Sequence, residues 1–278
     1  MFSLASSVSN YFSMSDKEAN LEKSIFSLPQ ETLDKVQGNP AKVLELIEEH
    51  CPVAMFLGRE KAEIIRKELT KRKKSSSTTT EPLLFAELGC YMGYSALLLT
   101  HLLELDSPNA NPKSKYYSFE ISEKFASIAR KFVKLAGLED RVEIIVGPAA
   151  DTLVEFEQRI RKENDGKYTP FDFVLIDHRK DLYVPDLRIL ESLNLVAPGT
   201  VLVGDNIIRP GAPEYHAYVN MTPEEKREYN YANPSIHGNS FNGRWNLVYV
   251  TQSFESGGYH GPGLDQIDVT ECVDFLNG

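Results

Sequence analysis

Short apolar segments alternate with longer amphipathic segments over most of the chain after residue 82. The short segments have the length of strands, and the segments between them carry apolar residues at helical spacing. Repeated strand–helix units of this kind are typical of a parallel sheet that helices cover on both faces. We therefore predict an α/β fold with a doubly wound, mostly parallel sheet. The predicted strands are Leu83–Gly89, Tyr116–Ile121, Val142–Gly147, Phe171–Asp177 and Thr200–Asn206.

The rest of the chain divides by its pattern into flanking parts. Residues 1–20 are Ser-rich and aperiodic, which predicts a flexible tail. Residues 21–70 show helical periodicity, and residues 71–81 are charged and then hydroxyl-rich, as in an exposed connector. A further strand in "RWNLVYVTQS" would suit an antiparallel edge. We predict a single domain over residues 21–278, with its α/β core in residues 82–278.

Composition and charge restrict the class of protein. A formal net charge of -10 argues against a broad nucleic-acid surface and against anionic membranes as partners. The three cysteines are scattered without metal-site or disulfide spacing, which favours a reducing compartment. The start lacks the pattern of a signal peptide, and no apolar run is long enough to span a bilayer. We expect a cytoplasmic protein; the oligomeric state is left open, and a monomer is compatible with the sequence.

The ends of the predicted strands carry the candidate chemistry, because ligands of such sheets bind outside the carboxyl ends of the strands. The first turn, "ELGCYMGYS", has Gly89 and Gly93 before a helix, but it lacks the third glycine of a dinucleotide fingerprint. Glu87 in the same turn disfavours a phosphate ligand. Glu120 ends the second strand, where a carboxylate can accept hydrogen bonds from both ribose hydroxyls. This pattern favours S-adenosylmethionine over a nicotinamide dinucleotide, although the two glycines could also be turn residues alone.

Two neighbouring strand ends offer oxygen ligands for a metal. Asp177 follows the fourth strand, and Asp205 and Asn206 follow the fifth. Two carboxylates and an amide oxygen suit a hard cation such as Mg²⁺. Two alternatives remain open at this point: Asp-Asn is also a good turn or helix cap, and Asp177 could pair with Arg179 or Lys180. The coincidence on adjacent strands is what favours the metal.

Four segments resemble the catechol O-methyltransferase family, in order along the chain: "ELGCYMGYSALLL", "FEISEKFASIARKFVKLAGLEDRVEIIVGPAADTL", "LIDHRKDLYVPDLRILE" and "GTVLVGDNIIRPGAPEYHAYV". The resemblance covers about residues 55–219 and resumes at "YHGPG". It implies a class I methyltransferase, with a Rossmann-like sheet and a reversed edge hairpin. It also implies magnesium-dependent transfer of a methyl group from S-adenosylmethionine to one hydroxyl of a catechol or related vicinal diol, which is a small-molecule substrate.

The resemblance also assigns roles by motif position. It implies Asp177, Asp205 and Asn206 as metal ligands and Lys180 as the general base, with Lys180, Asn206 and Pro210 facing the substrate. Glu120 would bind the ribose. Arg179 stands where the family commonly has an aromatic residue, and we expect it to face solvent. The full set of implied cofactor-binding residues is Met55, Leu57, Glu87, Tyr91, Gly93, Ser95, Glu120, Ile121, Gly147, Asp177 and His178.

The chain departs from the family mainly in the substrate wall. The family has a late glutamate in a "SFLEY"-like segment, and the nearest matches in "NSFNGRWNLVYV" are Gly243 or Asn246, which supply no carboxylate. Val53 replaces an aromatic gate, and Ala149 and Ala150 replace polar adenine contacts.

Two other classes remain as alternatives. A methyltransferase-like binding protein without turnover is disfavoured by the retained metal ligands and Lys180. A nicotinamide-dependent oxidoreductase is disfavoured by Glu87 and the missing third glycine.

Overall fold

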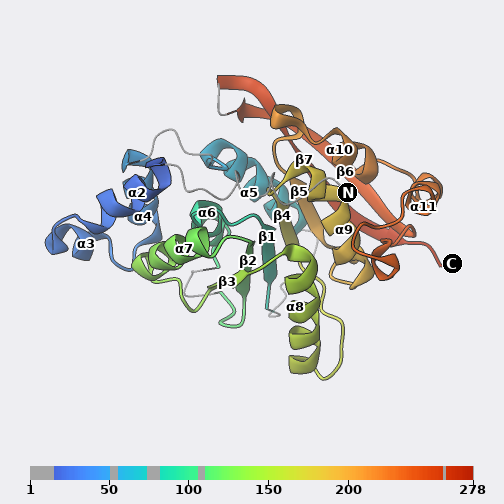
Figure 1. The fold of residues 1–278 in the computed structure, drawn as a ribbon, viewed down its shortest axis with the longest axis horizontal. Helices are drawn as coiled ribbons and strands as arrows, with labels where there is room; N and C mark the ends of the chain where they lie inside the picture. Colours follow the sequence, from blue (N-terminus) through green and yellow to red (C-terminus); the bar gives the residue numbers. More distant parts are fainter. Residues whose placement is uncertain (1–15, 51–55, 74–81, 106–109, 259–260, 278) are drawn as a thin grey trace, which may run out of the picture.

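The computed structural model describes residues 16–50, 56–73, 82–105, 110–258 and 261–277. Within these ranges a seven-stranded sheet forms the centre of the molecule, in the order β3-β2-β1-β4-β5-β7-β6 (Figure 1). Strands β1 to β5 are parallel, and β7 runs antiparallel to β5 and β6. The strands are β1 (Leu84–Leu88), β2 (Lys115–Glu120), β3 (Val142–Val146), β4 (Phe173–Ile176), β5 (Val201–Gly204), β6 (Leu247–Gly258) and β7 (Gly261–Phe275).

Helices cover both faces of this sheet, as the alternation of strands and helices predicts. On one face α5 (Arg59–Lys73), α6 (Tyr94–Leu102) and α7 (Glu123–Ala136) pack on the sheet. An outer layer of α2 (Asp16–Phe26), α3 (Gln30–Val36) and α4 (Pro40–His50) lies over them, with α4 packed on α6 and α7. The other face packs against α8 (Ala149–Glu163), α9 (Tyr183–Ser192), α10 (Pro213–Val219) and α11 (Pro223–Ala232). Short helical turns occur at η1 (Lys180–Leu182), η2 (Ile207–Gly211) and η3 (Asn239–Phe241).

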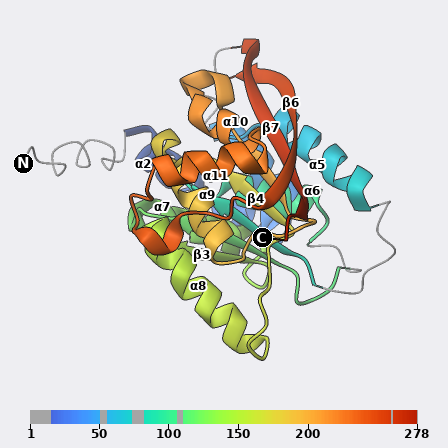
Figure 2. The same cartoon turned by 90° about the vertical axis from the view of Figure 1, so that its right-hand side faces the viewer.

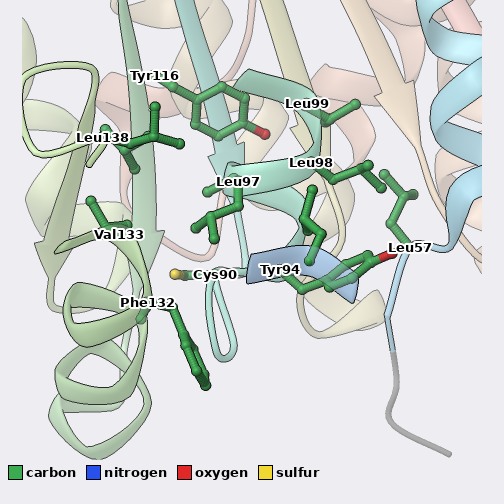
Figure 3. Packing of buried hydrophobic residues seen from close by; sticks show 14 of the residues in the cluster. Leu57, Cys90, Tyr94, Leu97, Leu98, Leu99, Tyr116, Phe132, Val133 and Leu138 are labelled. Atoms are coloured by element: carbon green, nitrogen blue, oxygen red, sulfur yellow. The ribbon is translucent and has the colours of Figure 1, made fainter. Parts of the chain in front are cut away.

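Adjacent strand residues contribute to opposite cores, because successive side chains of a strand point to opposite faces. Phe85 and Tyr116 belong to the core on the α6 side, where Figure 3 shows Tyr116 close to the leucines of α6. Their neighbours Ala86 and Tyr117 belong to the core on the α8 side. All five residues of β1 are buried, which places this strand at the centre of the fold. The prediction of a doubly wound, mostly parallel sheet is confirmed.

The sequence pattern located the five parallel strands to within two residues at each end, but it missed β7. This strand contains Asp265 and Asp268, which are 1% and 0% exposed, so its buried face does not look apolar. The reversed edge hairpin implied by the family resemblance is present as β6 and β7, which project beyond the other strands (Figure 2). Helix α2 begins at Asp16, inside the predicted tail, and α5 continues to Lys73, inside the predicted connector.

Crossing a bilayer requires a helix that is both long and apolar. A span needs about 20 consecutive, mostly apolar residues. Among the described residues, no helix combines the necessary length with the necessary apolar character.

Gly204 allows α10 to pack on the end of β5, and this gives a test of the fold. A Cβ atom added at Gly204 would lie 2.3 Å from Cε1 of the Tyr215 ring. Since overpacking typically costs about 1–3 kcal/mol, Gly204→Ala should lower the free energy of unfolding by that amount in urea denaturation. Tyr215→Leu removes the ring, so the double variant should lose less stability than the sum of the two single variants. If the two losses of stability simply added in the double variant, Gly204 and the Tyr215 ring would not be in steric contact.

Candidate active site

The turn between β1 and α6 is shaped by a close backbone approach. Gly89 has φ 102°, and its N–H donates to the carbonyl oxygen of Phe119 at 2.9 Å. A Cβ at this position would lie 2.5 Å from the carbonyl oxygen of Asp177. Only glycine combines this backbone conformation with so little space. The residue therefore lets the end of β1 lie directly beside the end of β4.

Glu87 lies beneath this turn, inside the sheet. Its side chain is fully buried and accepts hydrogen bonds from Ser118 Oγ at 2.6 Å and Tyr116 Oη at 3.0 Å. Burial raises the pKa of Glu87 to about 7, although hydrogen bonds from Ser118, Ser95 and Tyr116 act in the opposite direction. The predicted cofactor residues Glu87 and Ser95 are thus brought together by the fold.

Glu120 ends β2 beside the same turn. Its Oε2 accepts the N–H of Tyr91 at 2.7 Å, and its Oε1 accepts the N–H of Ser122 at 2.8 Å. Burial raises the pKa of this carboxyl group, while the backbone hydrogen bonds lower it in part. The next residue, Ile121, is 52% exposed despite its apolar side chain. A fixed carboxylate beside an exposed apolar surface can bind both the hydroxyls and the flat base of a nucleoside.

The other predicted cofactor residues differ in their surroundings. The Tyr91 ring packs against Phe125, with ring centroids 4.9 Å apart. Gly93 precedes α6, and the N–H of Gly147 donates to the Glu120 carbonyl oxygen at 2.9 Å. Leu57 is buried in the core on the α6 side, and Figure 3 shows it near Tyr94. Met55 lies outside the described residues, as does the departure at Val53.

His178 follows Asp177 at the end of β4. Its Nε2 lies 2.8 Å from Asp186 Oδ2, and its ring stacks on that of Tyr183 with centroids 5.2 Å apart. The contact with Asp186 was not predicted from the sequence, although Asp186 belongs to the quoted "DHRKDLYVPD" motif. The neighbouring Arg179 pairs with Asp181 on the surface, where their side chains are 48% and 62% exposed.

Lys180 connects the ends of β4 and β5. Its Nζ lies 3.0 Å from Asp177 Oδ1 and 3.0 Å from Asn206 Oδ1, and it also donates to Tyr183 Oη. Tyr183 is buried and donates to the carbonyl oxygen of Asp205 at 3.1 Å. The register of β4 with β5, which pairs Ile176 with Gly204, places Asp177 beside Asp205. The four residues predicted for the metal and the base therefore form one cluster.

Two members of this cluster were missed in the sequence. Lys61 of α5 is 4% exposed, and its Nζ donates to Asp205 Oδ1 at 2.6 Å and to Asp265 Oδ2 at 2.7 Å. These partners are 144 and 204 residues away along the chain, so no local pattern indicates them. Asp265 shows that a carboxylate from β7 reaches the carboxyl ends of the parallel strands, although Gly243 and Asn246 supply none.

The nearest sequence matches to the family's late glutamate lie elsewhere. Gly243 N–H bonds to Ser192 Oγ at 3.0 Å, and the Asn246 amide donates to the Leu276 carbonyl oxygen at 2.8 Å. Both precede β6, whose first residue pairs with Phe275 at the end of β7 far from Asp265. They therefore lie at the end of the sheet where the parallel strands begin, opposite the end that carries the cluster. The predicted substrate-facing Pro210 lies in η2, directly after the cluster.

Burial and ion pairing compete in this cluster. Burial raises the pKa of Asp205, and the nearby carboxylate of Asp177 raises it further, whereas Lys61 lowers it. Burial alone would lower the pKa of Lys61, but Asp205 and Asp265 hold it above its ordinary value. Burial likewise opposes ionisation of Asp265, yet the hydrogen bonds from Lys61 and Asn206 hold its pKa below the ordinary value. The Lys61–Asp265 pair is therefore charged.

The predicted metal donors are oxygen atoms, the type of ligand that Mg²⁺ prefers. In the ranges that the structure describes, no three Asp, Glu, His or Cys side chains form a metal-binding group. The predicted donors are instead two carboxylates and one amide. Oxygens of Asp177 and Asn206 already surround one cationic group, the Lys180 ammonium, at 3.0 Å each. Hard oxygen donors of this kind fit Mg²⁺, which completes its coordination with water and substrate oxygens.

Comparisons with known proteins point to an O-methyltransferase. A family model described as O-methyltransferase matches residues 82–222. Catechol O-methyltransferase of Mus musculus is 30% identical over 233 residues, which cover 83% of this chain and 76% of the relative. Catechol O-methyltransferase of Sus scrofa is 34% identical over 166 residues, covering 60% of this chain and 78% of the relative.

Solved structures agree at the level of the fold. The O-methyltransferase from Bacillus cereus, in complex with SAH, is 22% identical with a TM-score of 0.51, covering 92% of this chain and 97% of that structure. From the sheet order, the acidic strand ends and these likenesses together, we conclude that the chain belongs to the O-methyltransferase family and is an S-adenosylmethionine-dependent class I methyltransferase of the catechol O-methyltransferase type.

Proposed function

We propose that this enzyme transfers the sulfonium methyl group of S-adenosylmethionine to one hydroxyl of a catechol or related vicinal diol. Asp177, Asp205 and Asn206 would bind Mg²⁺, and Lys180 would act as the general base. The observation that carries the proposal is the position of Lys180 Nζ, 3.0 Å from an oxygen of both Asp177 and Asn206. The relatives named catechol O-methyltransferase support the choice of acceptor.

On the cofactor side, residues at the ends of β1 and β2 would bind and orient S-adenosylmethionine. Glu120 is held by the N–H groups of Tyr91 and Ser122, so its carboxylate is preorganised to accept the ribose hydroxyls. The exposed Ile121 offers an apolar contact for the adenine ring. Because Gly89 lets β1 approach β4, the methionine end of the cofactor would lie close to the Asp177 side of the site. This arrangement brings donor and acceptor together in one orientation.

On the acceptor side, the chain must remove one proton and exclude water. Mg²⁺, when bound, favours the ionised form of a coordinated hydroxyl and disfavours a nearby ammonium charge. Lys180, which lies beside Asp177, Asn206 and Tyr183, would release its own proton to solvent, and its neutral Nζ would then accept the hydroxyl proton of the acceptor. The catechol oxygen forms the new bond to the methyl carbon, the carbon–sulfur bond breaks, and the sulfonium charge is lost. Pro210 and the 52% exposed Ile208 would contact the flat ring.

The direct test is methyl transfer to catechol and a panel of related vicinal diols, with and without Mg²⁺. Product formed only with Mg²⁺ supports the proposal. Tight binding of S-adenosylmethionine without turnover on any acceptor would favour a binding protein. Binding of NAD in place of S-adenosylmethionine, measured by isothermal titration, would favour an oxidoreductase.

Glu120→Gln tests the cofactor contact. The variant loses a charge-assisted pair of hydrogen bonds to the ribose, so affinity for S-adenosylmethionine should fall by about 1–3 kcal/mol in isothermal titration. Metal dependence of activity should persist. The control is Glu123→Gln, since Glu123 forms an ion pair with Arg130 in which its side chain is 67% exposed. Equal cofactor affinity in both variants would remove Glu120 from the site.

Asp205→Asn tests the metal. Turnover should fall on the order of 10² or more, because metal assistance contributes several kcal/mol to such reactions. Affinity for S-adenosylmethionine should stay within a few fold, since Asp205 faces Lys61 and not the ribose-binding strand end. In the wild-type enzyme, a chelator should abolish activity and added Mg²⁺ should restore it. Full activity in excess chelator would exclude a required metal.

Lys180→Ala tests the base. Loss of a positioned base should lower kcat on the order of 10² or more at neutral pH, with a much smaller change in substrate KM. Raising the pH should partly restore the rate, since more substrate is then already ionised. Lys180→Arg should not restore it, because a guanidinium group stays protonated.

The matched control for Lys180 is its neighbour. Arg179→Ala should cost little in rate, because Arg179 pairs with Asp181 at the surface. If Lys180→Ala turned over normally while Arg179→Ala were inactive, the assignment of the base would be wrong.

A further inference from the structure

Asp265 lies at the centre of a hydrogen-bond network that no motif of the sequence indicates. Its side chain is 1% exposed. Oδ2 accepts from Lys61 Nζ at 2.7 Å and from Asn206 Nδ2 at 2.9 Å. Oδ1 accepts the backbone N–H of Arg209 at 3.1 Å and that of Ile208 at 3.3 Å. An ionised carboxylate has about four lone-pair positions, and these four donors occupy them. Asp265 is therefore a structural acceptor, without a free position for a metal or a substrate hydroxyl.

The network determines which end of the Asn206 amide faces the site. An amide presents an oxygen on one side and an NH₂ group on the other. Here the Nδ2 side meets the Asp265 carboxylate, and the Oδ1 side meets the Lys180 ammonium at 3.0 Å. The reversed amide would place oxygen against a carboxylate and NH₂ against an ammonium group. Only the observed orientation satisfies both neighbours, and only this orientation offers an oxygen to a cation.

Lys61 likewise fixes the orientation of Asp205, the other predicted metal ligand at the end of β5. Its ammonium group bridges Asp265 Oδ2 and Asp205 Oδ1, at 2.7 Å and 2.6 Å. Asp205 Oδ1 also accepts the N–H of Asn206 at 2.7 Å. The Asp205 carboxylate is thus fixed from two directions, by α5 and by the backbone that follows β5.

We propose that Asp265, acting together with Lys61, is a positioning residue that fixes Asn206 and Asp205 for divalent-cation binding. The inference rests on the proposed function, and it adds two residues to it. Through the N–H groups of Ile208 and Arg209, the same carboxylate holds the turn that carries Pro210. Asp265 therefore couples the geometry of the metal ligands to that of the predicted substrate wall. Residues that orient metal ligands typically change metal affinity or activity by 10–100-fold when they are replaced.

Asp265→Asn is the central test, with Mn²⁺ as the probe of the site. The variant keeps the shape of the side chain but loses one acceptor oxygen, so it cannot hold all four donors. The dissociation constant for Mn²⁺, measured by isothermal titration on the S-adenosylmethionine complex, should rise by about 10–100-fold. The Mg²⁺ concentration for half-maximal activity should rise in parallel, and excess Mg²⁺ should recover part of kcat. Cofactor affinity without metal should stay within about threefold.

Asp268→Asn is the matched control. Asp268 lies three residues further along β7, is 0% exposed, and bonds to His216, Ser253 and Gln266. It touches none of the predicted metal ligands through these bonds. The same loss of a buried carboxylate should lower the melting temperature, but Mn²⁺ affinity should remain within about threefold of the wild type.

The outcomes separate this inference from the proposed function. If the wild type binds Mn²⁺ and Asp265→Asn binds it equally well, or if both variants lose affinity to the same extent, the positioning role is overturned while the proposed function stands. If the wild type binds no divalent cation, the metal in the proposed function fails and the inference fails with it. Selective loss in Asp265→Asn supports the inference.

A measurement on the wild type covers the case in which Asp265→Asn does not fold. In a crystal structure of the wild-type enzyme with Mn²⁺, Asn206 Oδ1 should face the ion while Nδ2 stays within hydrogen-bond distance of Asp265. Direct coordination of the ion by Asp265, or an Asn206 amide turned away from it, would overturn the proposal.

Discussion

The site is organised around a buried ammonium group between two buried carboxylates. Lys61 reaches the end of β5 from α5 and pairs with Asp205 and Asp265 at 2.6 Å and 2.7 Å. Removing one partner from such a buried group costs about 3–5 kcal/mol, because the remaining charge has no compensation. Lys61 comes from α5, Asp205 directly follows β5, and Asp265 lies in β7. Their pairing therefore ties these elements together at the edge where the chemistry is proposed.

A comparison with a second buried lysine shows how strongly nearby carboxylates decide the pKa of a buried ammonium group. Lys226 of α11 is 0% exposed, and its Nζ lies 4.0 Å from Glu191 and donates to the Leu247 carbonyl oxygen at 3.1 Å. Here burial prevails and lowers the pKa of the lysine. At Lys61 two close carboxylates raise the pKa. Lys226 fixes α11 to the sheet, whereas Lys61 is held in its charged form beside the predicted metal ligands.

On the side proposed for the methyl donor, backbone contacts and not ion pairs fix the positions of the residues. Gly89 lets the first and fourth strands approach, and the N–H groups of Tyr91 and Ser122 hold Glu120. The proposed acceptor side, in contrast, depends on ion pairs between Lys180, Lys61 and three aspartates. Transfer of a methyl group from a sulfonium to an acceptor oxygen needs these two halves at a fixed separation, which the carboxyl ends of one parallel sheet supply.

The α/β architecture, the five parallel strands and the acidic residues at their ends could be predicted from the sequence, because periodicity and strand-end chemistry are local properties. The motifs around Asp177, Lys180 and Asp205 likewise lie in continuous segments, so the resemblance to a family could assign them. Lys61 and Asp265 joined the site only through folding, which also placed Gly243 and Asn246 at the end of the sheet where the parallel strands begin. The reason is physical: an ion pair between residues 204 positions apart leaves no periodic signal. Two buried aspartates in β7 also hide that strand from any pattern based on hydrophobicity.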